Sequence, residues 1–99
     1  FWTADMIDAA ECLRLGLVNR VVPHAALAEE TMALARTLAA KPPLALALAK
    51  RAVYASGERT LTQMLDYELD AQLRCFESGD AAEGITAFLE KRAPAFGGT

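Results

Sequence analysis

The sequence DAAEGITAFLEKRAPAF at residues 80–96 combines a helix start, a short amphipathic helix and a stop. Asp80 can accept a hydrogen bond from the backbone N–H near Glu83, while the Glu83 side chain can reach back to the N–H of Asp80, as in a capping box. The proline in the stretch ends the helix, because proline cannot continue a helical interior. At about 100° per residue, Phe88 and Lys91 lie side by side one turn apart. The stretch therefore predicts a helix that presents an aromatic ring and an ammonium group on one side.

Apolar periodicity and cap signals predict four more helices upstream. Asp8 and Glu11 have capping-box spacing, and Gly16 can end the helix that follows them in the left-handed conformation. Further helices are expected at about residues 25–40, 43–55 and 60–78, the last one opening with another capping-box spacing at Thr60 and Gln63. The sequence thus predicts an all-α chain of about five helices.

Residues 17–23, LVNRVVP, are the one candidate for extended structure. Their β-branched residues favour a short strand or extended segment, and Pro23 prevents its continuation. A single short strand does not make a sheet. The segment therefore either pairs with a strand outside this chain or lies as extended coil across a helix.

Composition indicates that the chain is too small to bury all of its apolar residues. The chain has 99 residues, at most one small domain or a piece of a larger one, and its hydrophobic share is 54%. We infer that some apolar faces meet a partner, either missing chain or other subunits, so that the isolated chain should self-associate. The clearest such face is formed by leucines that repeat every four residues: Leu61, Leu65, Leu69 and Leu73.

Charge and hydropathy exclude several classes of partner. The formal net charge is −3, without clustered lysine and arginine, which argues against a nucleic-acid ligand. The longest strictly apolar run, residues 44–49, is far shorter than the roughly 20 residues of a membrane-spanning helix. We therefore expect a soluble, cytoplasmic protein with no membrane partner, in which Cys12 and Cys75 are inert thiols.

Few side chains could carry chemistry by themselves. His24 is the only histidine and has no cysteine, second histidine or carboxylate pair at ligand spacing, so no metal site is expected. Asp66 and Asp70 share a helix face, but carboxylates on an amphipathic helix usually form its solvated side. Glu68 falls near the leucine face, where partial burial would require a partner.

Two blocks of the sequence together resemble the carboxyl-terminal part of the enoyl-CoA hydratase/isomerase (crotonase) family. The first is AAECLRLGLVNRVVP at residues 9–23, and the second is SGDAAEGITAFLEKRAPAF at residues 78–96. Both occur in order, with Pro42-Pro43 and the helix that carries Lys50 between them. The resemblance covers nearly the whole chain.

This resemblance implies that residues 1–99 are the C-terminal helical segment of a crotonase fold, whose spiral core of ββα turns lies upstream and is absent here. In that family the terminal helices cover the active site and build a trimer, often paired into a hexamer, so a homo-oligomer is expected. Family enzymes of fatty acid metabolism, among them lyases and isomerases, stabilise a thioester enolate with two backbone N–H groups, while one or two glutamates move protons. Those groups belong to the core. Residues 1–99 are accordingly expected to hold no catalytic residue and no cofactor beyond a CoA thioester as substrate, and to be inactive alone.

The resemblance also assigns a ligand role to two residues of the chain. Phe88 and Lys91 match family positions that lie near the adenine and phosphates of CoA, frequently CoA bound to a neighbouring subunit. Phe1-Trp2-Thr3 corresponds to the strand-to-helix region beside the acyl pocket, and the chain departs from the family there, with Ala4 where glycine commonly follows. The rival interpretation is a non-catalytic helical association module whose leucine faces serve only subunit contacts.

Overall fold

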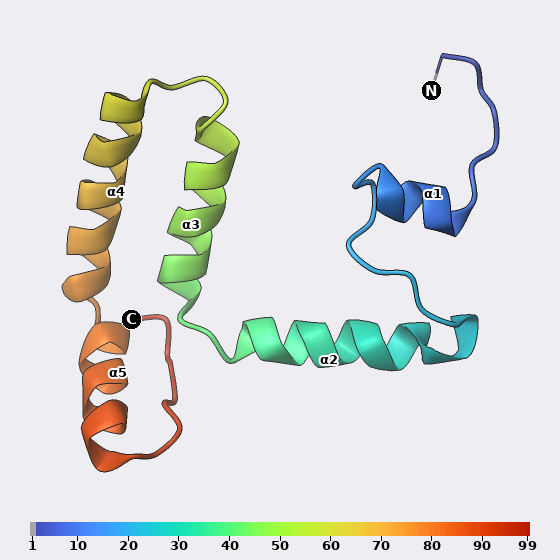
Figure 1. Ribbon diagram of the computed structural model, residues 1–99. Helices are drawn as coiled ribbons and strands as arrows, with labels where there is room; N and C mark the ends of the chain where they lie inside the picture. The colour runs from blue at the N-terminus through green and yellow to red at the C-terminus, as the bar shows by residue number, and fades with distance from the viewer. Residues whose placement is uncertain (1) are drawn as a thin grey trace. The chain divides into compact units, whose positions relative to one another are not determined.

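The computed structural model describes residues 2–99, and Phe1 lies outside the described residues. These residues form five α-helices and one short 3-10 helix (Figure 1). Their bounds are α1 Ala9–Arg14, η1 His24–Ala26, α2 Leu27–Ala39, α3 Pro43–Ala55, α4 Leu61–Phe76 and α5 Gly79–Glu90. No strand occurs within residues 2–99, so the all-α prediction is confirmed.

Very little of the chain is buried. The chain divides into two compact units, Phe1–Leu34 and Ala35–Thr99. Among residues 2–99 the buried side chains are those of Leu48, Ala87 and Asp80. No helix in this described part is long and apolar enough to cross a bilayer. The expectation that apolar faces stay uncovered within the chain is therefore confirmed, and such faces need a partner.

Helix α1 begins and ends close to where the sequence predicts. The Asp8 carboxylate accepts a hydrogen bond from the Glu11 N–H at 2.8 Å. Gly16, at φ 73°, ends the helix in the left-handed conformation, and its N–H and that of the next residue donate to carbonyls of the last turn. The Glu11 carboxylate binds the Arg14 guanidinium at 2.6 Å instead of reaching back to Asp8. Only half of the predicted capping box therefore forms.

Beyond α1 the first unit has no packed core. Residues 17–23 form no regular secondary structure within the described chain. Arg20 pairs with Glu30 of α2 at 3.6 Å, and both side chains are exposed. None of residues 2–34 is buried. The apolar side chains of this unit are therefore at most half-buried within it.

The amino-terminal turn keeps a backbone that suits glycine. Trp2 and Thr3 lie in an exposed turn. Ala4, where the family commonly has glycine, adopts φ 57°, in the left-handed region that only glycine enters without a steric cost. Alanine at this position therefore carries a steric cost that glycine would not.

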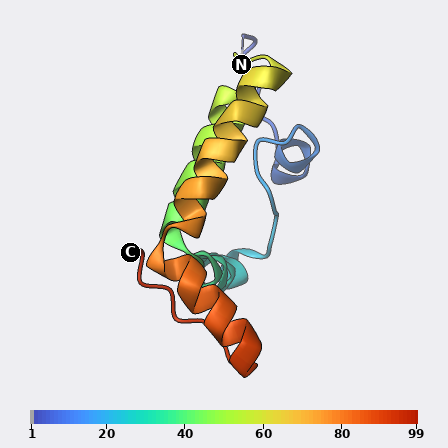
Figure 2. The same cartoon turned by 90° about the vertical axis from the view of Figure 1, so that its left-hand side faces the viewer.

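Helices α3 and α4 form a hairpin whose arms run side by side in both views (Figures 1 and 2). Helix α3 follows Pro42, with Pro43 at its first position, where the fixed φ of proline suits a helix and its missing N–H leaves no bond unmade. Helix α4 opens with the predicted capping box. The Gln63 N–H donates to Thr60 Oγ1 at 3.3 Å, and the Thr60 N–H donates to Gln63 Oε1 at 2.9 Å.

The half-buried face of α4 packs against α3, and the leucines of α4 stay exposed. The Tyr67 hydroxyl donates to the carbonyl of Leu48 at 3.1 Å. The half-buried positions of α4 recur one turn apart: Met64, Tyr67, Ala71 and Cys75. The leucines predicted as an apolar face are exposed by 76%, 55%, 61% and 54%: Leu61, Leu65, Leu69 and Leu73. This leucine face is therefore a surface of the chain.

Helix α5 and the residues after it form a closed loop. The tail turns back at the end of α5 and runs along the helix to its first turn (Figures 1 and 2). There the Asp80 N–H donates to the carbonyl of Thr99 at 3.3 Å. The Phe96 ring lies beside Gly84, at a distance where a Cβ atom would make ordinary van der Waals contact. The tail is thus bound to the helix at both ends of the loop.

Candidate functional site

Asp80 binds the tail and does not cap the helix. Ser78 is the N-cap residue, and its hydroxyl accepts the N–H three residues ahead at 3.3 Å. Asp80 lies in the first turn of α5, is 4% exposed, and accepts the N–H groups of Gly97 at 2.7 Å and Gly98 at 3.1 Å. The predicted capping box of Asp80 and Glu83 is wrong, because the serine takes the cap two residues earlier and frees the aspartate for the tail.

Glu83 forms an ion pair with Arg92 beyond the end of the helix. The Arg92 Nη1 and Nη2 atoms lie 2.6 Å and 2.9 Å from the two carboxylate oxygens, and Arg92 Nε lies 2.7 Å from Glu90. The Glu83 carboxylate also accepts the Ala95 N–H at 2.7 Å. These bonds, with that to Arg92 the largest, lower the pKa of Glu83 from 4.5 to about 2, and the two carboxylates raise the pKa of Arg92.

Lys91 ends helix α5 in an unusual backbone conformation. Its φ is 55° and its ψ is 37°, the left-handed region that non-glycine residues rarely adopt. The Lys91 N–H donates to the carbonyl of Phe88 at 3.3 Å, and the Arg92 N–H donates to that of Ala87 at 3.0 Å. These paired bonds make a Schellman motif with lysine where glycine is usual. The predicted stop at Pro94 thus comes earlier, at Lys91.

The two residues that the resemblance assigned to CoA lie three positions apart at the end of α5. The Phe88 side chain is 80% exposed on the last turn of α5, and Lys91 follows it at the helix end. The Lys91 ammonium has no hydrogen-bond or ion-pair partner within residues 2–99. An exposed aromatic ring can stack on a planar base, and a free ammonium can pair with a phosphate.

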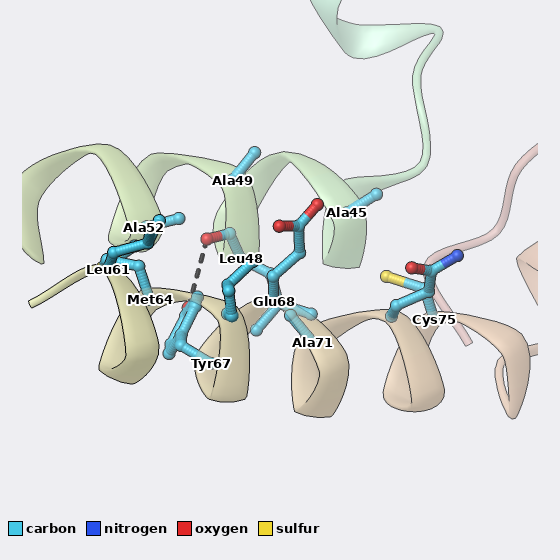
Figure 3. Close-up of a pocket in the computed structure, with 12 residues that line it drawn as sticks. Ala45, Leu48, Ala49, Ala52, Leu61, Met64, Tyr67, Glu68, Ala71 and Cys75 are labelled. Carbon is cyan, nitrogen blue, oxygen red and sulfur yellow. Dashed lines mark hydrogen bonds between the residues drawn. The ribbon is translucent and has the colours of Figure 1, made fainter. Parts of the chain in front are cut away.

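Sequence reasoning missed an apolar groove between α3 and α4 (Figure 3). It has a volume of about 510 Å³ and is lined from α3 by Ala45, Leu48, Ala49 and Ala52, and from α4 by Leu61, Met64, Leu65, Tyr67, Glu68, Ala71, Gln72 and Cys75. The alanines one turn apart on α3 are the signal that could have found it, since they leave an open space opposite α4. Phe88 and Lys91 do not line this groove.

Glu68 lies in the groove without a partner. Its carboxylate extends from α4 toward α3 in Figure 3. The sequence indicated that Glu68 would need a partner if it were partly covered, whereas the residue is exposed and has no ion pair in the described part of the chain. Solvent access therefore satisfies this carboxylate within residues 2–99.

The other candidates for chemistry stay apart from one another. His24 lines a shallow apolar depression with Leu27 and Met32. Asp66 shares a polar depression with Arg59, whose guanidinium lies 5.4 Å from the Tyr67 ring centroid. No group of histidine, cysteine, aspartate and glutamate side chains among the described residues could hold a metal ion. The free residues at the end of α5 are the strongest candidate site.

Comparison with known proteins identifies the relatives of the chain. The sequence model of the family described as Enoyl-CoA hydratase/isomerase matches residues 1–99. Crotonyl-CoA hydratase of Syntrophomonas wolfei is 40% identical over 95 residues, which cover 96% of this chain and 36% of that protein. The 1,2-epoxyphenylacetyl-CoA isomerase of Escherichia coli is 37% identical and is matched over 95% of this chain and 36% of its own length. The chain thus spans little more than a third of these relatives.

A solved structure of an enoyl-CoA hydratase is also similar to this chain. The crystal structure of an enoyl-CoA hydratase from Bacillus anthracis matches with a TM-score of 0.91 and 35% identity over 99% of this chain and 38% of that chain. The match extends over both units of the chain, including the helix end that carries Lys91.

Proposed function

The chain belongs to the enoyl-CoA hydratase/isomerase family, and from that premise we propose that it is the carboxyl-terminal part of an enzyme that acts on acyl-CoA thioesters. The proposed reaction of this complete enzyme is the addition of water to a 2-enoyl-CoA. The described residues contribute contacts to CoA and to other subunits. The ligand role is supported by an unpartnered Lys91 ammonium at the end of the helix turn whose Phe88 ring is exposed.

The chemistry of CoA fits these two groups. CoA carries phosphates, which pair with an ammonium through charge-assisted hydrogen bonds, and an adenine, which stacks on an aromatic ring. Lys91 supplies the cation and Phe88 the ring, and the two are joined by a backbone hydrogen bond. We assign them to the nucleotide end of the substrate, away from the reacting acyl group.

The reacting groups belong to the core that precedes these helices in the proposed enzyme. Two backbone N–H groups of the core hold the enolate oxygen of the thioester, and a glutamate moves protons between water and substrate. Residues 1–99 by themselves should therefore leave the ultraviolet absorbance of crotonyl-CoA unchanged. A decay that depends on the concentration of this 99-residue polypeptide would contradict the assignment.

Replacement of Lys91 by alanine in the complete enzyme tests the ligand role. Loss of a hydrogen bond between charged groups costs about 1.5–3 kcal/mol, so the apparent KM for crotonyl-CoA should rise roughly tenfold or more while kcat changes little. With crotonyl-pantetheine, which lacks the nucleotide, Lys91→Ala should have no effect. Lys41→Ala, on an exposed lysine between α2 and α3, is the matched control. Equal KM values for the Lys91→Ala variant and the unchanged enzyme would remove Lys91 from the site.

The subunit contacts have their own support and test. The leucine face of α4 is exposed by 54% or more, and large apolar surfaces of that kind mark interaction sites. We propose that it takes part in a homo-oligomer, a trimer or a dimer of trimers. Isolated residues 1–99 should self-associate, and sedimentation as a monomer that binds no hydrophobic dye would argue against this part.

A non-catalytic association module is the second candidate, favoured by the same exposed leucines. It predicts apolar contacts between subunits and no affinity for CoA. Calorimetric titration of the complete protein with CoA separates the two candidates, since an enzyme that acts on acyl-CoA should release or absorb heat when it binds CoA. Absence of heat at CoA concentrations up to the millimolar range would favour the module.

A further inference from the structure

The two neighbouring cations at the end of α5 have different surroundings. The Arg92 guanidinium is held by both oxygens of Glu83, at 2.6 Å and 2.9 Å, and by Glu90 at 2.7 Å. The Lys91 ammonium has no such partner in residues 2–99. Arg92 is therefore neutralised within the chain, and Lys91 is the cation that remains available to an anion.

The backbone on both sides of Lys91 is bound to α5. Before it, the carbonyl of Phe88 accepts the Lys91 N–H, as the helix end requires. After it, Glu83 holds the Arg92 side chain and accepts the Ala95 N–H at 2.7 Å. One carboxylate thus fixes the chain at two points beyond Lys91, which leaves the residue little freedom to change its φ.

The left-handed conformation of Lys91 has a cost that these contacts offset. A side chain in this region costs about 1–2 kcal/mol relative to right-handed backbone, and such residues persist only where the surroundings hold them. Glycine would adopt φ 55° without that cost. The strained backbone sets the direction in which the Cα–Cβ bond of Lys91 leaves the helix end. Loss of the Glu83 contacts would let Lys91 relax and its ammonium move.

We infer that Glu83 and Arg92 are positioning residues, which hold the turn so that the Lys91 ammonium meets a phosphate of CoA. This inference rests on the proposed function. Arg92 does not touch the substrate, because its guanidinium is occupied by carboxylates. The bidentate Glu83–Arg92 geometry is the essential feature, and a positive charge at position 92 is not sufficient.

Glu83→Gln in the complete enzyme removes the negative charge of the Glu83–Arg92 ion pair and keeps the size of the side chain. The apparent KM for crotonyl-CoA should rise roughly fivefold with little change in kcat, since a loosened turn misplaces a single charged hydrogen bond. With crotonyl-pantetheine the KM should not change. Arg92→Lys keeps the positive charge but cannot form the bidentate pair, so it should raise the KM in the same way. An Arg92→Lys enzyme with the same KM as the unchanged enzyme would overturn the inference.

A matched control exists on another helix. Glu11 and Arg14 form an ion pair of the same kind at α1, also with an N–O distance of 2.6 Å. Glu11→Gln should leave the KM for crotonyl-CoA unchanged. A rise equal to that of Glu83→Gln would attribute the effect to general loosening and overturn the positioning role.

Combination with Lys91→Ala separates this inference from the proposed function. If Glu83 acts through Lys91, Glu83→Gln should add nothing to the KM of the Lys91→Ala enzyme. Additive effects, or no effect of Glu83→Gln while Lys91→Ala raises the KM, would overturn the inference and leave the proposed function intact. No effect of Lys91→Ala would instead reject the proposed function. Thermal midpoints of all variants well above the assay temperature would show that unfolding is not the cause.

Discussion

Helices α1 and α5 end with the same backbone bonds but with different residues. At α1, Gly16 takes φ 73° and its N–H donates to Leu13 at 3.1 Å; at α5, Lys91 takes φ 55° and its N–H donates to Phe88 at 3.3 Å. Glycine makes this turn at no steric cost, while lysine adds a cost and a charge. The two ends thus share their backbone bonds and differ in the side chain at the left-handed position, which is a lysine only at α5.

The segments that follow the two helix ends also differ, because only the one after α5 is held by side chains of its helix. After Gly16, residues 17–23 form coil. After Lys91, the carboxylates of Asp80 and Glu83 hold backbone N–H groups of the tail at 2.7 Å. A strained residue needs such support, and a glycine does not.

The largest expected effect concerns the support of the tail. Asp80→Ala leaves two tail N–H groups without their buried acceptor, so it should lower the free energy of unfolding of the complete enzyme by about 3 kcal/mol. Asp8→Ala at α1 removes one exposed cap bond and should cost about 1 kcal/mol. Urea unfolding measures both. Equal losses would mean that the tail contacts are no stronger than an ordinary cap.

Exchange of the residue at each helix end should change stability with opposite signs. Gly16→Ala introduces a side chain at φ 73° and should destabilise by about 1 kcal/mol. Lys91→Gly removes the same cost and should stabilise by up to about 1 kcal/mol. A loss of stability in both variants, measured by urea unfolding, would show that Lys91 is not strained.

A smaller gain is expected at the amino-terminal turn. Ala4 is the other non-glycine residue with positive φ among residues 2–99. Ala4→Gly should stabilise the complete enzyme by about 0.5 kcal/mol, because glycine removes the steric cost but is more flexible when unfolded. Thermal unfolding would detect this as a small rise in midpoint, and a fall would contradict the expected relief.

The smallest expected effect is the loss of stability at acid pH through the Glu83–Arg92 ion pair, since this pair is partly open to water. The pKa of Glu83 is lowered to about 2, so its contribution to stability is present above its ordinary pKa of 4.5 and is lost as the pH falls toward 2. The pKa of Glu11 is also lowered, by its hydrogen bond to Arg14. NMR titration of labelled carboxyl carbons should place the Glu83 midpoint below that of Glu11. A Glu83 midpoint near 4.5 would contradict the short contacts.

Local patterns predicted the helices well, because caps and apolar periodicity act over a few residues. The Thr60–Gln63 spacing formed the predicted capping box, whereas the same spacing at Asp80 and Glu83 did not. Spacing alone cannot decide between two adjacent candidate caps. Asp80 binds Gly97, 17 residues away, and such a partner is set by the path of the tail.

Surface and groove features were harder to predict from sequence. Leucine periodicity predicted an apolar face on α4 but could not say that Tyr67 and Ala71 would meet α3 in its place. The groove depends on how two helices approach each other, which no single helix pattern contains. Spacing placed Lys91 on the helix one turn after Phe88, whereas the helix ends at Glu90 and Lys91 takes a left-handed backbone, for which lysine carries no sequence signal.

We propose that the Lys91 ammonium, and not the turn it occupies, binds CoA. Lys91→Gly is the direct test, because it improves the backbone and removes only the charged side chain. Calorimetric titration of the complete enzyme with CoA should give a Kd roughly tenfold weaker in this variant, with a thermal midpoint equal to or above that of the unchanged enzyme. An unchanged Kd would contradict the account.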